Sequence, residues 1–188
     1  ESGIMQNGKV KIMVDARAAA KAIKLRIPDY AGKTKIMLND MPITLTAKDG
    51  YYLFKPEIGK STLNIDFQIK PRWISANSNV RADIGKVALQ YGPCIYCLEE
   101  IDNKDHLGEI YVDTQSKPQV IESINGLFGN LPFIKYNGFR LKNNSDDNKE
   151  LYMVPEFSKI ETEIKAVPYC LWGNRKGGEM LVWQKALI

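Results

Sequence analysis

The sequence is poor in the residues that build metal and redox sites. Its 188 residues include one histidine, His106, and three cysteines. Cys94 and Cys97 form a Cys-x-x-Cys motif, but a zinc site needs a second pair of ligands, and Cys170 and His106 do not supply one at a useful spacing. A redox pair normally opens a helix, whereas this motif lies in a strand-like run. We therefore predict no metal, no cofactor and buried structural cysteines.

An odd number of cysteines also argues against a disulfide framework, because three thiols cannot all pair within one chain. On a strand, a spacing of three places Cys94 and Cys97 on opposite faces. This geometry further weakens a joint chemical role for the two residues.

Long apolar runs and blocks of like charge are absent as well. No run approaches the length of a membrane-spanning helix, so we predict no membrane insertion. The formal net charge of +4 comes from lysines spread along the chain. A nucleic-acid surface needs basic residues gathered on one face, so we predict no nucleic-acid partner. The apolar content is 44% and the charged content is 26%. Both values are ordinary for a globular protein.

Helical periodicity is scarce, and alternation of apolar and polar residues dominates. The alternating or apolar runs that predict strands are 9–14, 22–27, 34–38, 51–54, 63–69, 86–91, 94–98 and 133–141. Many short strands with turn signals between them are typical of a sandwich or barrel. The predicted fold class is all-β, an antiparallel β-sandwich with little helix.

A polar segment, residues 75–79, separates the first group of strands from the second. We take it as a candidate boundary between two packed jelly-roll-like sandwich units, residues 1–76 and 77–188. In one alternative, the C-terminal strand returns to the first unit.

Two stretches carry the strongest patterns. In residues 85–99, Gly92-Pro93 separates two apolar runs and predicts a corner between buried strands. In residues 167–183, two apolar runs flank a glycine-rich loop, which predicts a hairpin. Gly177-Gly178 does not predict a phosphate site, because a strand-like run follows it rather than a helix.

The charged run 99–106 is interpreted as a solvated loop. Adjacent carboxylates such as Glu99 and Glu100 point apart on a strand, which is poor geometry for an acid/base pair. The glycine-rich loop also carries charged and amide side chains, which we predict to bind one another or a neighbouring domain. These residues are Asn174, Arg175 and Glu179.

Two blocks of the sequence together resemble the C-terminal region of glycoside hydrolase family 127, the bacterial β-L-arabinofuranosidase-like enzymes. The first block is 81–93 with Ile95 to Glu99; the second contains Pro168-Tyr169, Trp172, Asn174-Arg175, Gly178-Glu179-Met180 and Val182-Trp183. The resemblance covers nearly the whole chain. Tyr91 and Cys94 depart from it, since the family often has arginine and an aliphatic residue there.

The resemblance implies that catalysis takes place elsewhere. In that family, the active site lies in an (α/α)6 barrel that precedes the β-sandwich domains. It uses a cysteine nucleophile, a zinc ion held by cysteines and a glutamate, and a glutamate acid/base. Cys94, Cys97 and Cys170 match none of these motifs, so no catalytic residue is carried over. The chain is not expected to be an enzyme by itself.

Three functions are compared. The first is a non-catalytic domain that supports the barrel of the same polypeptide or builds a homo-oligomer interface. The second is a carbohydrate-binding module for a plant-type glycan, with Trp73, Trp172, Trp183, Tyr51 and Tyr52 as candidates. The third, an independent enzyme, ranks lowest because no triad, metal set or separated carboxylate pair can be assembled.

The residues assigned to a carbohydrate or domain interface are Trp73, Trp172, Asn174, Arg175 and Glu179. Trp183 is assigned to the core. The resemblance favours a periplasmic or extracellular location over a cytoplasmic one.

Overall fold

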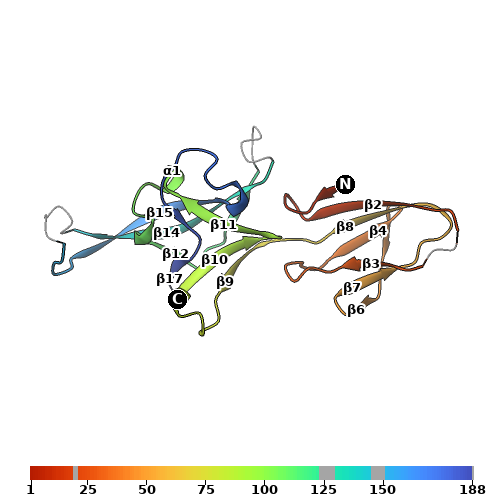
Figure 1. Ribbon diagram of the computed structural model, residues 1–188, viewed down its shortest axis with the longest axis horizontal. Helices are drawn as coiled ribbons and strands as arrows, with labels where there is room; N and C mark the ends of the chain where they lie inside the picture. The colour runs from red at the N-terminus through yellow and green to blue at the C-terminus, as the bar shows by residue number, and fades with distance from the viewer. Residues whose placement is uncertain (19–20, 123–129, 145–150, 188) are drawn as a thin grey trace. The chain divides into compact units, whose positions relative to one another are not determined.

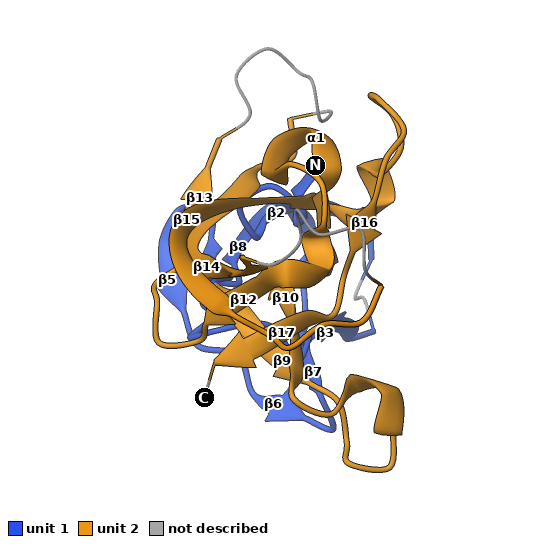
Figure 2. Ribbon diagram, turned by 90° about the vertical axis from the view of Figure 1, so that its left-hand side faces the viewer, with its two compact units in different colours: residues 1–70, 91–93 blue, residues 71–90, 94–188 orange. Residues whose placement is uncertain are grey.

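The computed structural model describes residues 1–18, 21–122, 130–144 and 151–187. Its contacts group into two compact units (Figure 2). Unit 1 comprises Glu1–Lys70 with Tyr91–Pro93, and unit 2 comprises Pro71–Gln90 with Cys94–Ile188. Strands are the main regular structure of both (Figure 1), so the predicted all-β sandwich class is confirmed. The predicted domain boundary between Ala76 and Asn77 stays a prediction.

Unit 1 contains a five-stranded and a three-stranded sheet, both antiparallel. The first has the order β1 (Ser2–Gly3), β2 (Lys9–Ala16), β8 (Gly59–Asp66), β4 (Lys35–Leu38) and β5 (Met41–Ile43). The second has the order β3 (Ile23–Arg26), β7 (Tyr51–Phe54) and β6 (Ala47–Lys48).

Alternation explains why β2 and β8 are strands. Ile12 lies opposite Leu63, which is fully buried, whereas Lys11 lies opposite Asn64 on the outer face. Because side chains alternate across a strand, one face supplies the core and the other meets solvent. Leu63 is fully buried, and replacing such a leucine by alanine costs about 2–5 kcal/mol.

Unit 2 is organised around a nine-stranded sheet. Its strands are β9 (Pro71–Ser75), β10 (Lys86–Tyr91), β11 (Cys94–Glu99), β12 (Ile110–Asp113), β13 (Gln119–Ile121), β14 (Phe133–Asn143), β15 (Phe157–Pro168), β16 (Met180–Leu181) and β17 (Gln184–Leu187). β11 pairs with β10 as well as with β15, so β10, β17, β12, β14, β15 and β11 form a closed, barrel-like ring. In this ring β17 pairs antiparallel with β10, and β14 pairs antiparallel with both β12 and β15. β15 pairs antiparallel with β11, whereas β12 and β17 are parallel.

Among the residues that the structure describes, helix occurs only in short pieces of unit 2. They are η1 (Arg81–Asp83), α1 (Glu100–Asn103), η2 (Leu107–Glu109) and η3 (Tyr169–Leu171). Among the described residues, no helix has the length and apolar character needed to cross a membrane.

The core of unit 2 combines aliphatic packing with buried hydrogen bonds. Ile134 and Ile164 are fully buried. The Tyr96 hydroxyl donates to the Pro132 carbonyl at 2.9 Å, and the Tyr136 hydroxyl donates to Gln184 Oε1 at 2.6 Å. Buried polar groups are costly unless they are hydrogen-bonded, so these bonds lower the free-energy cost of burying the two tyrosine hydroxyls.

One local expectation needs correction. Residues 167–183 do not form a hairpin: β16 pairs with β11, and β11 lies between β15 and β16. β17 pairs with β10 and β12, so the C-terminal strand lies in the sheet of unit 2. By contrast, the Gly92-Pro93 corner between β10 and β11 is confirmed. Gly92 has a φ of 54°, a left-handed conformation that suits glycine.

Candidate functional site

A cluster of paired charged side chains lies where β11 ends. Glu99 at the end of β11 and Asp102 in α1 both accept hydrogen bonds from the Arg175 guanidinium. Lys165 of β15 adds a second cation, with its Nζ 2.9 Å from Asp102 Oδ1. We call these four residues the charged clasp. Two carboxylates meet two cations there, so the formal charges balance.

The charged clasp is largely shielded from solvent. The side chains of Glu99, Asp102 and Arg175 are 4%, 10% and 17% exposed. Burial opposes the charged form of Asp102, but hydrogen bonds from Arg175 and Lys165 outweigh it and hold the pKa of Asp102 below its usual range. The hydrogen bond with Asp102 raises the pKa of Arg175 against the effect of burial, and the bond with Glu99 adds to it.

The same clasp holds the loop that follows η3. Glu99 Oε1 accepts a hydrogen bond from the Gly173 backbone N–H at 3.0 Å. Arg175 lies two residues further on, so both ends of this short segment are attached to the same carboxylate. The arrangement fixes the loop against β11 and α1.

Glu179 attaches the far end of the loop. Its Oε2 accepts a hydrogen bond from the Leu107 backbone N–H at 2.7 Å, and its own N–H donates to Glu100 Oε2 at 2.8 Å. The Glu179 carbonyl accepts from the Glu100 N–H at 3.0 Å. A Cβ on Gly178 would lie 2.9 Å from Glu100 Oε2, so a larger residue there would require the Glu100 side chain to shift.

Among the predicted interface residues, Arg175 and Glu179 therefore attach the glycine-rich loop to β11, α1 and η2 within unit 2. Asn174 is exposed, and its side-chain N–H₂ donates to the Leu171 carbonyl at 3.0 Å. Whether any of these residues also touches a neighbouring domain stays a prediction. The interpretation of residues 99–106 as a solvated loop was wrong for Glu99, which is buried, and for Asp102, which is half-buried; both are paired with Arg175.

The tryptophans differ in their surroundings. Trp73 is half-buried and packs edge-on against Tyr136, with ring centroids 5.0 Å apart. Trp172 is 46% exposed and stacks on Tyr169, also 46% exposed, with centroids 6.2 Å apart and an interplanar angle of 12°. Trp183 is half-buried. The Tyr169–Trp172 pair is therefore an exposed aromatic surface of unit 2, and it includes Trp172, which was predicted to bind carbohydrate or a neighbouring domain.

The remaining aromatic candidates lie on β7 of unit 1. Tyr51 is 38% exposed and Tyr52 is half-buried. They occupy successive positions on one strand, so their rings point to opposite faces and do not form one platform.

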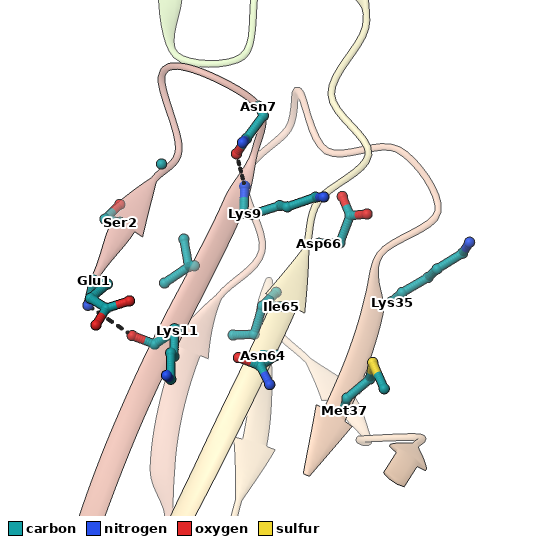
Figure 3. Close-up of a pocket in the computed structure, with 12 residues that line it drawn as sticks. Glu1, Ser2, Asn7, Lys9, Lys11, Lys35, Met37, Asn64, Ile65 and Asp66 are labelled. Carbon is teal, nitrogen blue, oxygen red and sulfur yellow. Dashed lines mark hydrogen bonds between the residues drawn. The ribbon is translucent and has the colours of Figure 1, made fainter. Parts of the chain in front are cut away.

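A shallow cavity of about 620 Å³ lies on the outer face of the five-stranded sheet of unit 1 (Figure 3). Lys9, Lys11 and Lys35 line it together with Asn64 and Asp66. Asp66 is in register with Lys9 on one side and Lys35 on the other, so its carboxylate offsets part of the positive charge. Sequence reasoning missed this groove, because it forms from strands that are distant in the sequence.

The cysteines lie close to β11 without forming a metal centre. Within the described parts of the chain, no three His, Cys, Asp or Glu side chains are placed to hold a metal ion. Burial raises the pKa of Cys94 to about 11 and that of Cys97 to about 12. The prediction of buried cysteines is confirmed for Cys94 and Cys97. It is wrong for Cys170, which is exposed.

The fold and the internally paired charges define an all-β region whose buried acidic groups serve structure. The family model described as the glycoside hydrolase family 127 C-terminal domain matches residues 71–185. The chain therefore belongs to the glycoside hydrolase family 127 C-terminal domain family.

Known relatives agree with this assignment. A non-reducing end β-L-arabinofuranosidase from Bifidobacterium longum subsp. longum is 27% identical over 184 residues, which cover 94% of this chain and 28% of the relative. A crystal structure of a family 127 β-L-arabinofuranosidase from Geobacillus stearothermophilus T6 matches all of this chain and 30% of its own, with 29% identity and a TM-score of 0.88. A family 127 β-arabinofuranosidase at 23% identity and a TM-score of 0.81 supports the fold. The chain thus spans less than a third of each of these relatives.

Proposed function

We propose that this chain is the non-catalytic C-terminal β-sandwich region of a β-L-arabinofuranosidase-like glycoside hydrolase. In this proposal, it supports the catalytic barrel of the same polypeptide. The observation that carries it is the combination of a C-terminal-domain match over residues 71–185 with coverage of only 28% of a β-L-arabinofuranosidase.

The chemistry of the charged clasp supports the same proposal. A general acid must hold a proton near neutral pH and present it to a ligand. Asp102 has a lowered pKa and is 10% exposed, so it is ionised and covered instead. Glu99, at 4% exposure, is engaged by Arg175 and by the Gly173 N–H. These carboxylates hold a loop in place, and neither lines the cavity on unit 1 or the two smaller cavities beside β14.

A hydrolysis assay tests the catalytic part of the proposal. The isolated chain should release no product from an aryl β-L-arabinofuranoside above a heat-denatured control. The matching longer protein, carrying the upstream barrel, should turn over the same substrate. Turnover by the isolated chain at a rate near that of the longer protein would refute the proposal.

A truncation tests the supporting part. Removing residues 1–188 from the longer protein should lower the soluble yield of the barrel or its thermal midpoint, and adding the separate chain should restore part of the loss. A barrel that is equally soluble, stable and active without residues 1–188 would argue against support. Light scattering on the longer protein, with and without these residues, would separate a role in a homo-oligomer from support within one polypeptide.

The Tyr169–Trp172 pair favours a second candidate, a carbohydrate-binding module. Flat aromatic rings bind sugar faces when they are exposed, and both rings are 46% exposed. Calorimetry with arabinan and other plant polysaccharides should then show binding that Trp172→Ala removes. Tyr51→Ala, at an exposed aromatic of unit 1, is the matched control and should leave it unchanged. No heat signal across these glycans would exclude the module.

A further inference from the structure

The strand β1 covers only the first part of the outer edge of β2, the edge that faces away from β8. The two residues of β1 lie opposite Val10 and Lys9. β2 continues to Ala16, and its other edge pairs with β8 along its whole length. Within the parts of the chain that the structure describes, no strand lies beside the outer edge of β2 beyond Lys11.

Glu1 extends the β1–β2 ladder by one residue. Its nitrogen donates to the Lys11 carbonyl at 3.0 Å (Figure 3), and its carbonyl accepts from the Lys11 N–H at 2.9 Å. Two residues that exchange both bonds form a hydrogen-bonded pair of an antiparallel ladder. Glu1 therefore continues β1 in strand geometry along the edge of β2.

The next backbone groups on this edge belong to Met13 and Asp15. Successive residues of an antiparallel strand direct their N–H and C=O groups to alternate sides. Lys11 faces β1, so the neighbouring Ile12 faces β8. Met13 and Asp15 face outward again, on the side where β1 has ended. Outward N–H and C=O groups on a strand edge are a template for a further strand.

We propose that the segment that leads into Glu1 in the longer protein continues β1 and closes this edge of β2. The inference rests on the proposed function, in which a catalytic barrel precedes residues 1–188 in the same polypeptide. The register of β1 places the second residue before Glu1 opposite Met13 and the fourth opposite Asp15. Backbone hydrogen bonds then attach unit 1 to the segment that arrives from the barrel.

A segment joined to Glu1 fits this edge better than a separate strand. It is held beside β2 at a high effective concentration by its covalent link. Its direction is already set, because Glu1 pairs with Lys11. A strand from another molecule would have to stop where Glu1 stands. The Met13 side chain is 67% exposed, so a cross-strand neighbour on that face can be accommodated.

Amide hydrogen exchange tests the proposal. It is measured residue by residue, by mass spectrometry with electron-transfer fragmentation, in the longer protein and in the chain of residues 1–188. The amides of Met13 and Asp15 should exchange more slowly in the longer protein, by about tenfold, because each gains a backbone hydrogen bond. The amide of Ile12 faces β8 in both proteins and is the internal reference.

Proline substitutions on β2 give a second measurement. Proline is tolerated on an edge strand where its missing N–H would face solvent. Met13→Pro should therefore lower the thermal midpoint of the longer protein more than that of the chain 1–188. Ile12→Pro is the matched control, because it removes a bond to β8 and should destabilise unit 1 in both proteins. If Met13→Pro folds in neither protein, the exchange rates of the wild type decide.

Two results would overturn the proposal. The first is equal exchange of Met13 and Asp15 in the two proteins while Ile12 stays protected. The second is slow exchange in the chain 1–188 that is lost on dilution, which would assign the edge to a second copy. Neither result depends on hydrolysis. An active longer protein with an open edge would refute this inference alone, whereas turnover by the isolated chain would refute the proposed function.

Discussion

Arg175 and Asp102 meet through both terminal guanidinium nitrogens and both carboxylate oxygens. Nη1 donates to Oδ1 at 3.0 Å, and Nη2 donates to Oδ2. A two-pronged pair of this kind fixes orientation as well as distance. Because Nη2 also binds Glu99 Oε2, one cation bridges two carboxylates from neighbouring elements.

Arg175→Ala should therefore be strongly destabilising. Removing one partner of a buried ion pair leaves an uncompensated charge, which costs about 3–5 kcal/mol. Lys165 still pairs with Asp102, so we expect a loss of about 3 kcal/mol in the free energy of unfolding, at the lower end of that range. All three tryptophans, Trp73, Trp172 and Trp183, lie in unit 2, so urea unfolding followed by their fluorescence measures this unit.

Arg81→Ala is the matched control for this measurement. Arg81 is an exposed arginine of unit 2. A surface substitution of this kind changes stability by about 0.5 kcal/mol or less. Equal unfolding midpoints for Arg175→Ala and Arg81→Ala would show that the charged clasp contributes little.

Acid should weaken unit 2 through Asp102. The pKa of Asp102 is lower in the folded chain, because hydrogen bonds from Arg175 and Lys165 outweigh burial. The stabilisation from the ionised group is complete above the unfolded-state pKa of about 3.9 and is lost as pH falls through the folded value. Asp102→Asn should be less stable than the wild type at pH 7, and the difference should shrink below about pH 4.

The measurement is the urea midpoint from tryptophan fluorescence at a series of pH values. Asp105→Asn, at a side chain 73% exposed, is the control and should follow the wild type throughout. A constant gap between Asp102→Asn and the wild type from pH 7 to pH 2 would contradict the prediction.

Gly138→Ala should destabilise the β12–β14 pairing. A Cβ at Gly138 would strike the Tyr111 carbonyl oxygen and Ile164 Cδ1. Overpacking of this kind costs about 1–3 kcal/mol. Gly108→Ala is the control because a Cβ there meets nothing within 4 Å. Thermal midpoints that fall equally in the two variants would indicate a general effect of the added methyl group.

The three thiols should differ in their rate of alkylation by iodoacetamide. Only the thiolate reacts, and burial raises the pKa of Cys94 to about 11 and that of Cys97 to about 12. In the reduced, folded chain, Cys170 should be labelled first, and the other two only after urea is added. Cys170→Ser should remove the fast phase. Comparable labelling of Cys97 in the folded chain would contradict the burial.

Local alternation was sufficient to predict many of the strands. β2, β4, β7 and β11 lie where the apolar pattern indicates them. β15 was missed because charged residues such as Glu161, Glu163 and Lys165 fill one of its faces, and only its second half is buried. Its partner β14 pairs with it over a long antiparallel register, from Ile134 opposite Ala166 to Asn143 opposite Phe157, which the sequence of β15 alone does not reveal.

At Asn137-Gly138, tertiary packing rather than the local turn pattern determines the backbone structure. The dipeptide is typical of a hairpin turn, and a turn there would have split the predicted strand 133–141. β14 instead runs through it unbroken. The glycine is needed because another strand approaches closely at Gly138, as the contacts of Tyr111 and Ile164 show.

The charged clasp was out of reach for a related reason. A run of acidic residues resembles a solvated loop when it is considered alone. The cations that pair with these carboxylates come from distant parts of the sequence. Arg175 lies 76 residues from Glu99, and Lys165 lies 63 residues from Asp102. From the sequence, Arg175 and Glu179 could be recognised as polar residues of a glycine-rich loop, but the residues that they contact could not be predicted.

The last strand of the ring, β17, inserts between β10 and β12. The strand Gln184–Leu187 satisfies backbone groups on two neighbours at once. Cutting the chain before Gln184 would therefore expose two unpaired strand edges, each a template for joining another chain. A shortened version of this protein would be expected to aggregate, so the final segment is as much a safeguard of solubility as a part of the core.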